Sequence, residues 1–265
     1  MQVIINAITQ RFTENHGDAQ RFLKGFLCVT LCFFRSGVPV NLCRPAVAVI
    51  ALITSPLYAQ NIESAMKSQK LVDVQTLDPS LLVELKYSTT DNFVKKDVYG
   101  DLTRAYMQPL AGERLAKANA LLKRQHPDLR LLVYDAARPR AAQWKLWEAL
   151  PQYSENERQK YVADPRKGSI HNYGCAVDLT IARVISNGYE PLDMGTIYDY
   201  FGVMAYPSQE QRLLTEGKLT KSQIANRQLL RSVMRQSGFT SIEYEWWHFN
   251  ALSREKAMMM FRIVE

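Results

Sequence analysis

Two short segments of the chain combine histidine with acidic residues in a way that could support metal chemistry. In the first, Asp178 follows His171 within residues 169–178; in the second, Glu245 precedes His248 by three positions. Neutral imidazoles and carboxylates suit Zn²⁺, whose catalytic sites take three protein ligands and leave one position for water. A nearby carboxylate can serve as a general base. Each segment taken alone is a weak signal, because such pairs also occur by chance.

The second segment also raises a geometric difficulty. In a regular strand, residues i and i+3 point to opposite faces, so Glu245 and His248 could not reach one site. A bulge or a strand end between them would remove the difficulty, and bulges concentrate beside active sites. The competing interpretation of an isolated E-x-x-H is a buried aromatic strand with a surface glutamate.

The elements expected to position these residues follow from hydrophobic periodicity and from helix-stop signals. We expect strands at 81–87, 131–134, 174–181 and 242–249, and helices at 111–125, 140–150 and 219–236. Strands separated by helices of uneven length predict an α+β fold, with a small, mostly antiparallel sheet flanked by helices. No repeat or linker divides this region, so residues 60–265 are predicted to form one domain.

The composition narrows the possible functions. Hydrophobic residues make up 47% of the chain and charged residues 22%, as in ordinary globular proteins. The net charge of +7 comes from scattered lysines and arginines, with neither a basic run nor interleaved aromatic residues, so we expect no nucleic-acid partner. Only Cys175 lies in the body of the chain, which excludes an internal disulfide there. His126, beside Pro127, is expected to be a solvated residue at a helix end.

Residues 1–59 are predicted to be a leader. An apolar stretch at 45–59 follows Arg44 and ends at Ala59, as in a secretory signal peptide. This stretch is shorter than the roughly 20 residues of a membrane-spanning helix, so we expect no stable span in the mature form. The residues before it are long for a signal peptide, and a start codon near residue 40 would explain them. We therefore expect export to the periplasm or another extracytoplasmic space; an uncleaved anchor would also place the domain outside the cytoplasm.

Several motifs, in order along the chain, resemble those of the zinc D-alanyl-D-alanine dipeptidases of the vancomycin-resistance type. They are Y-x-T-x-D-N-F at 87–93, D-x-x-R-P at 135–139, S-x-H-x-x-G-x-A-x-D-L-T at 169–180, M-G-T-x-Y-D at 194–199 and E-W-W-H at 245–248. Two features depart from that pattern. The interval from Arg138 to His171 is short, and Ile170, Asn172 and Tyr173 replace small or polar residues, which could alter substrate fit.

The resemblance implies a role for eight residues and an activity. His171, Asp178 and His248 would bind one Zn²⁺, and Glu245 would be the catalytic base. Arg138 would face the developing oxyanion, Asp199 and Tyr87 would lie near the free amine of the substrate, and Ser169 would lie near the substrate. The implied reaction is hydrolysis of the small D,D-dipeptide D-Ala-D-Ala, in salvage or remodelling of cell-wall material. The sequence makes no prediction of oligomeric state.

Three alternatives remain from the sequence. A zinc D,D- or L,D-carboxypeptidase or endopeptidase acting on peptidoglycan stem peptides would need a pocket open at the amine end. A non-catalytic, zinc-stabilised cell-wall binding module would need neither Glu245 nor Arg138. A serine enzyme could use the S-x-x-K of Ser64 and Lys67, but no K-T-G follows, and Ser64 is expected in a flexible tail.

Overall fold

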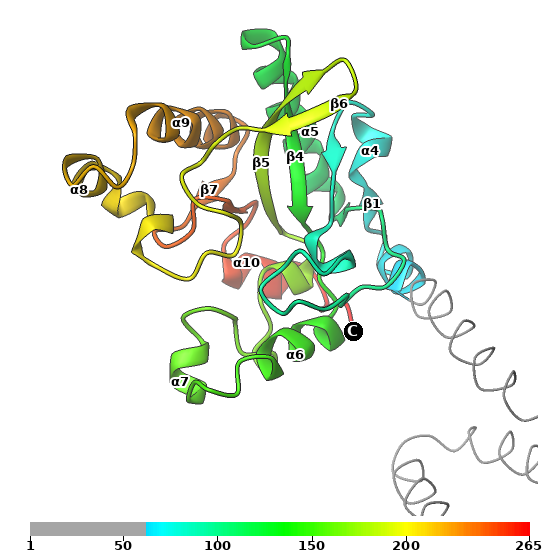
Figure 1. Ribbon diagram of the computed structural model, residues 1–265. Helices are drawn as coiled ribbons and strands as arrows, with labels where there is room; N and C mark the ends of the chain where they lie inside the picture. Colours follow the sequence, from blue (N-terminus) through cyan, green and yellow to red (C-terminus); the bar gives the residue numbers. More distant parts are fainter. Residues whose placement is uncertain (1–61) are drawn as a thin grey trace, which may run out of the picture. The chain divides into compact units, whose positions relative to one another are not determined.

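A six-stranded sheet forms the centre of the fold in the computed structural model, which describes residues 62–265 (Figure 1). Five strands run in the order β2–β4–β5–β8–β7, and β6 pairs with the far end of β5. Only the β2–β4 pair is parallel, so the sheet is mostly antiparallel, as predicted. A separate two-stranded sheet joins β1 to β3. The strands are β1 (Val72–Asp73), β2 (Leu82–Val83), β3 (Tyr106–Met107), β4 (Leu129–Asp135), β5 (Ala176–Ile185), β6 (Gly188–Pro191), β7 (Thr240–Ser241) and β8 (His248–Asn250).

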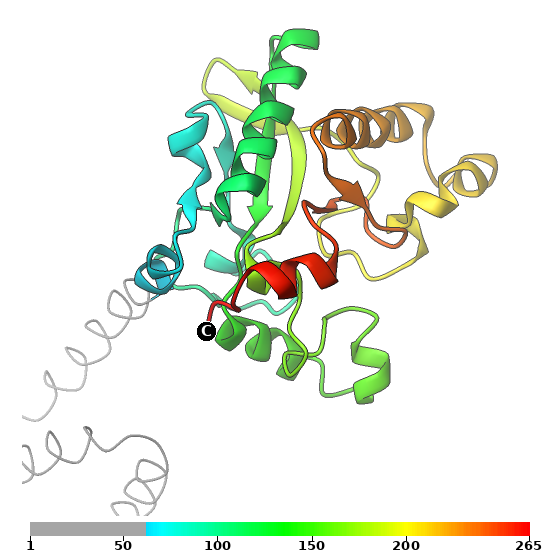
Figure 2. The same cartoon turned by 180° about the vertical axis from the view of Figure 1, so that it is seen from behind.

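Helices surround this sheet, which confirms the predicted single α+β domain. Seen from behind, α5 lies along one face of β4 and β5, with α9 beside it (Figure 2). At the end of the sheet where β4 stops, α6 and α10 lie beneath the strand tips (Figure 1). The helices are α4 (Val74–Leu77), α5 (Pro109–Gln125), α6 (Arg140–Glu148), α7 (Glu155–Arg158), α8 (Glu210–Thr215), α9 (Lys221–Gln236) and α10 (Arg254–Met260), with short 3-10 turns η1 (Lys86–Ser88), η2 (His171–Tyr173), η3 (Val203–Ala205) and η4 (Pro207–Gln209).

The packing of α5 on β4 follows from the spacing of apolar residues. Leu115, Ala118 and Leu122 are fully buried at helical spacing, and they face a strand whose Leu131 and Val133 are equally buried. Burying such side chains stabilises the fold by about 1.5–3 kcal/mol each. The helix ends at His126, an exposed C-cap residue whose amide donates to Leu122, as the following proline predicts.

A bulge in β4 brings three polar residues into one row across the sheet. Val133 lies opposite Leu179, but Asp135, not Tyr134, lies opposite Asp178, so β4 contains one extra residue there. On the other side of β5, Asp178 lies opposite His248. Residues directly opposite each other in a sheet share a face. Asp135, Asp178 and His248 therefore project from the same face of three neighbouring strands.

Two of the predicted strands are shorter in the structure. The chain between 81 and 87 keeps only β2 and then turns into η1, because the two-residue parallel pairing with β4 ends there. The segment from 242 to 247 is irregular, and strand structure begins only at His248. Glu245 therefore precedes a strand end, which removes the geometric difficulty of the E-x-x-H spacing.

The amino-terminal predictions are only partly within the described residues. The leader at 1–59 lies outside them. Residues 62–68 are helical and bury Met66, so the flexible tail expected around Ser64 is wrong. Lys67 forms an ion pair with Glu63 at 3.2 Å. Within residues 62–265, no helix combines the length and hydrophobicity needed to cross a membrane.

The turn that carries His171 depends on Gly174. This residue ends η2 in the left-handed conformation, with φ of 66°. A Cβ atom there would lie 2.9 Å from Leu71 Cδ2 and 3.2 Å from the backbone nitrogen of Gln108. The glycine is thus required both by its backbone conformation and by close approach of a neighbouring segment.

We expect Gly174→Ala to destabilise the fold by about 2–4 kcal/mol, combining left-handed strain with the steric clash. Gly217→Ala is a matched control, because Gly217 has φ of 68° but open space around the added Cβ; it should cost only about 1 kcal/mol. Urea denaturation of the two variants measures both values. Equal losses would show that the contacts with Leu71 and Gln108 do not constrain the turn.

Candidate metal centre and catalytic pocket

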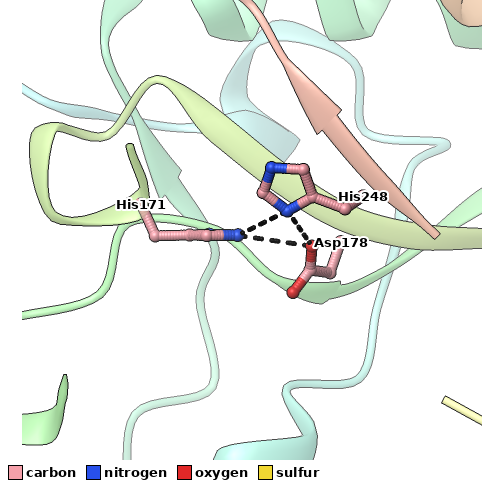
Figure 3. A group of neighbouring side chains, drawn as sticks. All are labelled: His171, Asp178 and His248. Atoms are coloured by element: carbon pink, nitrogen blue, oxygen red, sulfur yellow. Dashed lines mark hydrogen bonds and ion pairs between the residues drawn. The ribbon is translucent and has the colours of Figure 1, made fainter. Parts of the chain in front are cut away.

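Three side-chain atoms from three different elements meet at one point (Figure 3). His171 Nε2 lies 3.2 Å from His248 Nδ1 and 3.3 Å from Asp178 Oδ1, and the last two atoms are 2.9 Å apart. Ligands of a tetrahedral Zn²⁺ at 2.0–2.2 Å are separated from one another by about 3.3 Å. The triangle thus has the size of one face of a tetrahedral metal site.

A hydrogen bond at the outer nitrogen of each imidazole determines which ring nitrogen presents a lone pair to the triangle. His171 Nδ1 lies 2.7 Å from the carbonyl oxygen of Ala136, and His248 Nε2 lies 2.9 Å from Asn250 Oδ1. Both partners are acceptors, so in the neutral rings these outer nitrogens carry the proton and the inner nitrogens present lone pairs. Figure 3 shows the outer nitrogen of His248 pointing away from the triangle. The three inner atoms can therefore act together as ligands.

The electrostatics of the triangle favour a positive charge at its centre. Burial alone would raise the pKa of Asp178, but His171 and His248 outweigh it and hold that pKa well below its ordinary value. Burial opposes protonation of His248, yet its hydrogen bond with Asp178 prevails and raises its pKa to about 9. The other oxygen of Asp178 accepts from the Tyr198 hydroxyl at 3.0 Å. His171, Asp178 and His248 are thus a possible metal site.

Glu245 lies beside this triangle. Its Oε2 is 3.9 Å from His248 Nδ1, and its side chain is 28% exposed, so it is accessible from the pocket. Burial, together with the negative charge of Asp178, raises the pKa of Glu245, whereas His248 and His171 oppose the shift. A carboxylate with a raised pKa is better suited to accept and return a proton near neutral pH.

Three hydrogen bonds hold the guanidinium group of Arg138 in place. Its Nε donates to Asp135 Oδ2 at 2.9 Å, a second N–H reaches the same oxygen, and Nη1 donates to Gln143 Oε1 at 3.0 Å. Burial would lower the pKa of Arg138, but Asp135 keeps it well above its ordinary value. A guanidinium has five N–H donors, so two remain for the pocket, where Nη2 lies 3.8 Å from Asp178.

Asp199 and Tyr87 form a second polar group in the pocket. The Tyr87 hydroxyl donates to Asp199 Oδ2 at 2.9 Å. Burial and the charge of Asp178 raise the pKa of Asp199 well above its ordinary value, although Tyr87 and Arg138 oppose this. Asp199 also has a φ of 58°, an uncommon conformation outside glycine that is frequent at functional sites. A cationic partner would offset the cost of burying the charged form of this carboxyl group.

All eight site residues predicted from the sequence line one cavity of about 240 Å³. Ser169 lies in its wall with its hydroxyl 3.5 Å from Gln143 Oε1. Ile170, Asn172 and Tyr173, the replacements noted in the first histidine motif, are not among the lining residues. The Asn172 side-chain amide instead donates to the carbonyl of Arg138. The cavity also includes 159–163, which belong to the short interval between Arg138 and His171.

The residues that hold the eight site residues in position were not predicted from the sequence. Asn250 and Tyr198 fix His248 and Asp178, while Asp135 and Gln143 fix Arg138. Asp135 and Tyr198 lie inside the motifs at 135–139 and 194–199, so the sequence marked their positions. It did not indicate which residue each of them contacts. Gln143 has no such signal, because its position one turn into α6 becomes meaningful only after the helix is placed.

Comparison with known proteins agrees with this geometry. Residues 67–262 match the family model described as D-Ala-D-Ala dipeptidase, in peptidase family M15. A D-alanyl-D-alanine dipeptidase of Escherichia coli is 35% identical over 180 residues, which cover 68% of this chain and 83% of that protein. The corresponding enzyme of Enterococcus faecium is 31% identical, covering 63% of this chain and 83% of that protein. A D-alanyl-D-alanine dipeptidase from Enterococcus faecalis is 29% identical, and the match covers 64% of this chain and 85% of that protein.

The family match extends over most of the chain and contains every element of the pocket described above. The motifs of the sequence, the sheet that aligns Asp178 with His248, and the relatives all indicate the same class of hydrolase. The chain belongs to the D-Ala-D-Ala dipeptidase family of metallopeptidases.

Proposed function

We propose that this protein is a zinc-dependent dipeptidase that hydrolyses D-Ala-D-Ala. The observation that carries the proposal is the convergence of two imidazole lone pairs and one carboxylate oxygen beside Glu245. His171, Asp178 and His248 would hold the ion, and this ligand set leaves a dication with a net charge of +1. A bound zinc ion supplies Lewis acidity and lowers the pKa of a water molecule to about 7.

Glu245 is the base in this proposal. It accepts the proton of the attacking water and delivers it to the nitrogen of the leaving D-alanine. The raised pKa of Glu245 makes its carboxylate a stronger base toward the attacking water, and the protonated acid is still far more acidic than the amine that receives the proton. Glu245 Oε2 lies 3.9 Å from His248 Nδ1, so this carboxylate is next to the ligand triangle but is not a fourth ligand.

Arg138 stabilises the oxyanion that forms from the scissile carbonyl. Asp135 and Gln143 fix its guanidinium in advance, so little reorganisation is needed when negative charge develops. Tyr87 packs under the guanidinium, with the ring centroid 5.1 Å from Cζ. Preorganised donors of this kind typically contribute on the order of 10²–10³ in rate.

Asp199 binds the free ammonium of the substrate and so selects dipeptides. A peptide extended or blocked at its amino end would leave this carboxyl without its partner and would compete for space in a cavity of about 240 Å³. Pockets for drug-sized ligands are typically 300–1,000 Å³, so the cavity suits a small ligand. The Tyr87 hydroxyl orients Asp199 toward the bound amine.

The proposed setting is the periplasm or another extracytoplasmic space. The support is the leader pattern: Arg44, the apolar stretch at 45–59 and a small residue at its end. In that compartment the substrate would come from wall-derived dipeptide, and the role would be salvage or remodelling of peptidoglycan material.

Replacement of Glu245 by Gln should abolish the reaction while leaving the metal in place. We expect a loss of about 10²–10⁴ in kcat, because the proton carrier is removed and the ligands are intact. The measurements are D-alanine release from D-Ala-D-Ala and zinc content by mass spectrometry. His171→Ala should lose both activity and zinc, as should wild type treated with a chelator. Full activity in the Glu245 variant would exclude this residue as the base.

The amine requirement can be tested with N-acetyl-D-Ala-D-Ala. The wild type should prefer the free dipeptide by at least about a hundredfold, because a buried charge left unpaired costs several kcal/mol. Asp199→Asn should reduce kcat/KM for the free dipeptide and narrow that preference. Efficient cleavage of the blocked peptide by the wild type would instead indicate a carboxypeptidase acting on stem peptides.

Export can be tested by expressing the full chain in a Gram-negative host and sequencing the amino terminus of the protein recovered from the periplasm. We expect cleavage after Ala59, because small residues precede signal-peptidase sites. A protein found in the cytoplasm with residues 45–59 intact would contradict the proposed location.

A further inference from the structure

The proposed substrate carries two charges, and the groups described so far account for only one of them. At neutral pH a free dipeptide has an ammonium group and a carboxylate. Two residues span at most about 7 Å, so both charges must lie within the same small cavity. If Asp199 takes the ammonium, a cation in the cavity wall would complement the charge of the carboxylate.

Apart from the histidines, the described residues that line the cavity include two cations, Arg138 and Lys160. Arg138 already shares its charge with Asp135, which it contacts through two N–H groups, and it lies 3.8 Å from Asp178. In the proposed function its remaining donors serve the oxyanion. A second carboxylate on Arg138 would compete with that role.

Lys160 differs because its ammonium group is not committed to a carboxylate within ion-pair distance among the described residues. The charge of Lys160 helps to lower the pKa of Glu157, but the carboxylate of Glu157 is held by the Ser154 hydroxyl at 2.7 Å and the Ser154 amide at 3.0 Å. Lys160 is exposed and is one of the residues that line the cavity. A flexible lysine of this kind can follow a carboxylate that enters the cavity.

The backbone around Lys160 is well fixed. Its amide donates to the backbone carbonyl of Glu157, and Tyr161, the next residue, packs its ring against Phe201 at a centroid distance of 4.7 Å. The Gln143 side chain donates to the carbonyl of Ala163 at 2.8 Å, on the other side of Lys160. The same Gln143 accepts from Arg138, so this wall and the oxyanion group are held by one buried side chain.

We propose that Lys160 binds the terminal carboxylate of the dipeptide and makes the enzyme selective for a free carboxyl end. This inference rests on the proposed function, in which Asp199 binds the opposite end. Together the two residues recognise the zwitterion by charge at both ends. The segment that contributes Lys160 lies between α7 and η2, in the interval between Arg138 and His171.

The test compares D-Ala-D-Ala with its carboxamide, D-alanyl-D-alaninamide, in the wild type and in Lys160→Met. Loss of the ammonium should reduce kcat/KM for the acid about three- to tenfold, mainly through KM, and leave the amide nearly unchanged. The acid-to-amide ratio should therefore fall by the same factor. Lys160→Arg should restore most of the ratio, because it returns the charge.

Lys221→Met is the control for general electrostatics, since it removes the same charge from an exposed position at the start of α9. The Lys221→Met variant should have the same acid-to-amide ratio of kcat/KM as the wild type. An unchanged ratio in Lys160→Met, with normal hydrolysis by the wild type, would overturn the assignment of Lys160 alone. A zinc-loaded wild type that leaves the dipeptide intact would overturn the proposed function, and this assignment with it.

Discussion

The site depends on the alignment of three residues across adjacent strands. Asp135, Asp178 and His248 occupy one row of the sheet only because β4 contains an extra residue at Tyr134. A slip of one residue in either strand pair would turn a side chain to the opposite face. The bulge therefore sets the position of Arg138, through Asp135, relative to the metal ligand Asp178. Burial of both faces of β4 by α5 and the pocket elements fixes this register.

Charge balance is the second constraint on the pocket. Asp135, Asp178, Asp199 and Glu245 bring four carboxyl groups close together, and such a cluster is stable only with compensating cations or raised pKa values. Arg138 compensates Asp135, and the two imidazoles compensate Asp178. The pKa values of Asp199 and Glu245 are raised instead. In the proposed reaction, Glu245 carries a proton and Asp199 binds the ammonium group of the substrate.

Much of the pocket is built on irregular segments that the regular elements hold in place. Buried Arg227 of α9 donates to the carbonyl of Met194 at 2.6 Å and to that of Met204 at 2.9 Å, which anchors the segment containing Asp199. Gln143 of α6 anchors the wall at 159–163 in a similar way. Rigid helices thus position loops whose side chains can differ between relatives, and substrate preference can change without a change of fold.

The sequence by itself determined the residue types of the site, the α+β class and the main helices. His171, Asp178, Glu245 and His248 stand in short motifs, and the periodicity of α5 and α9 is local, so both can be recognised without coordinates. Only the tertiary structure decided how these motifs meet. The bulge at Tyr134, the strand end before His248 and the contacts of Gln143 and Asn250 depend on pairing between segments far apart in the chain. Such pairing has no local signature, because its free energy comes from packing and register across the whole sheet.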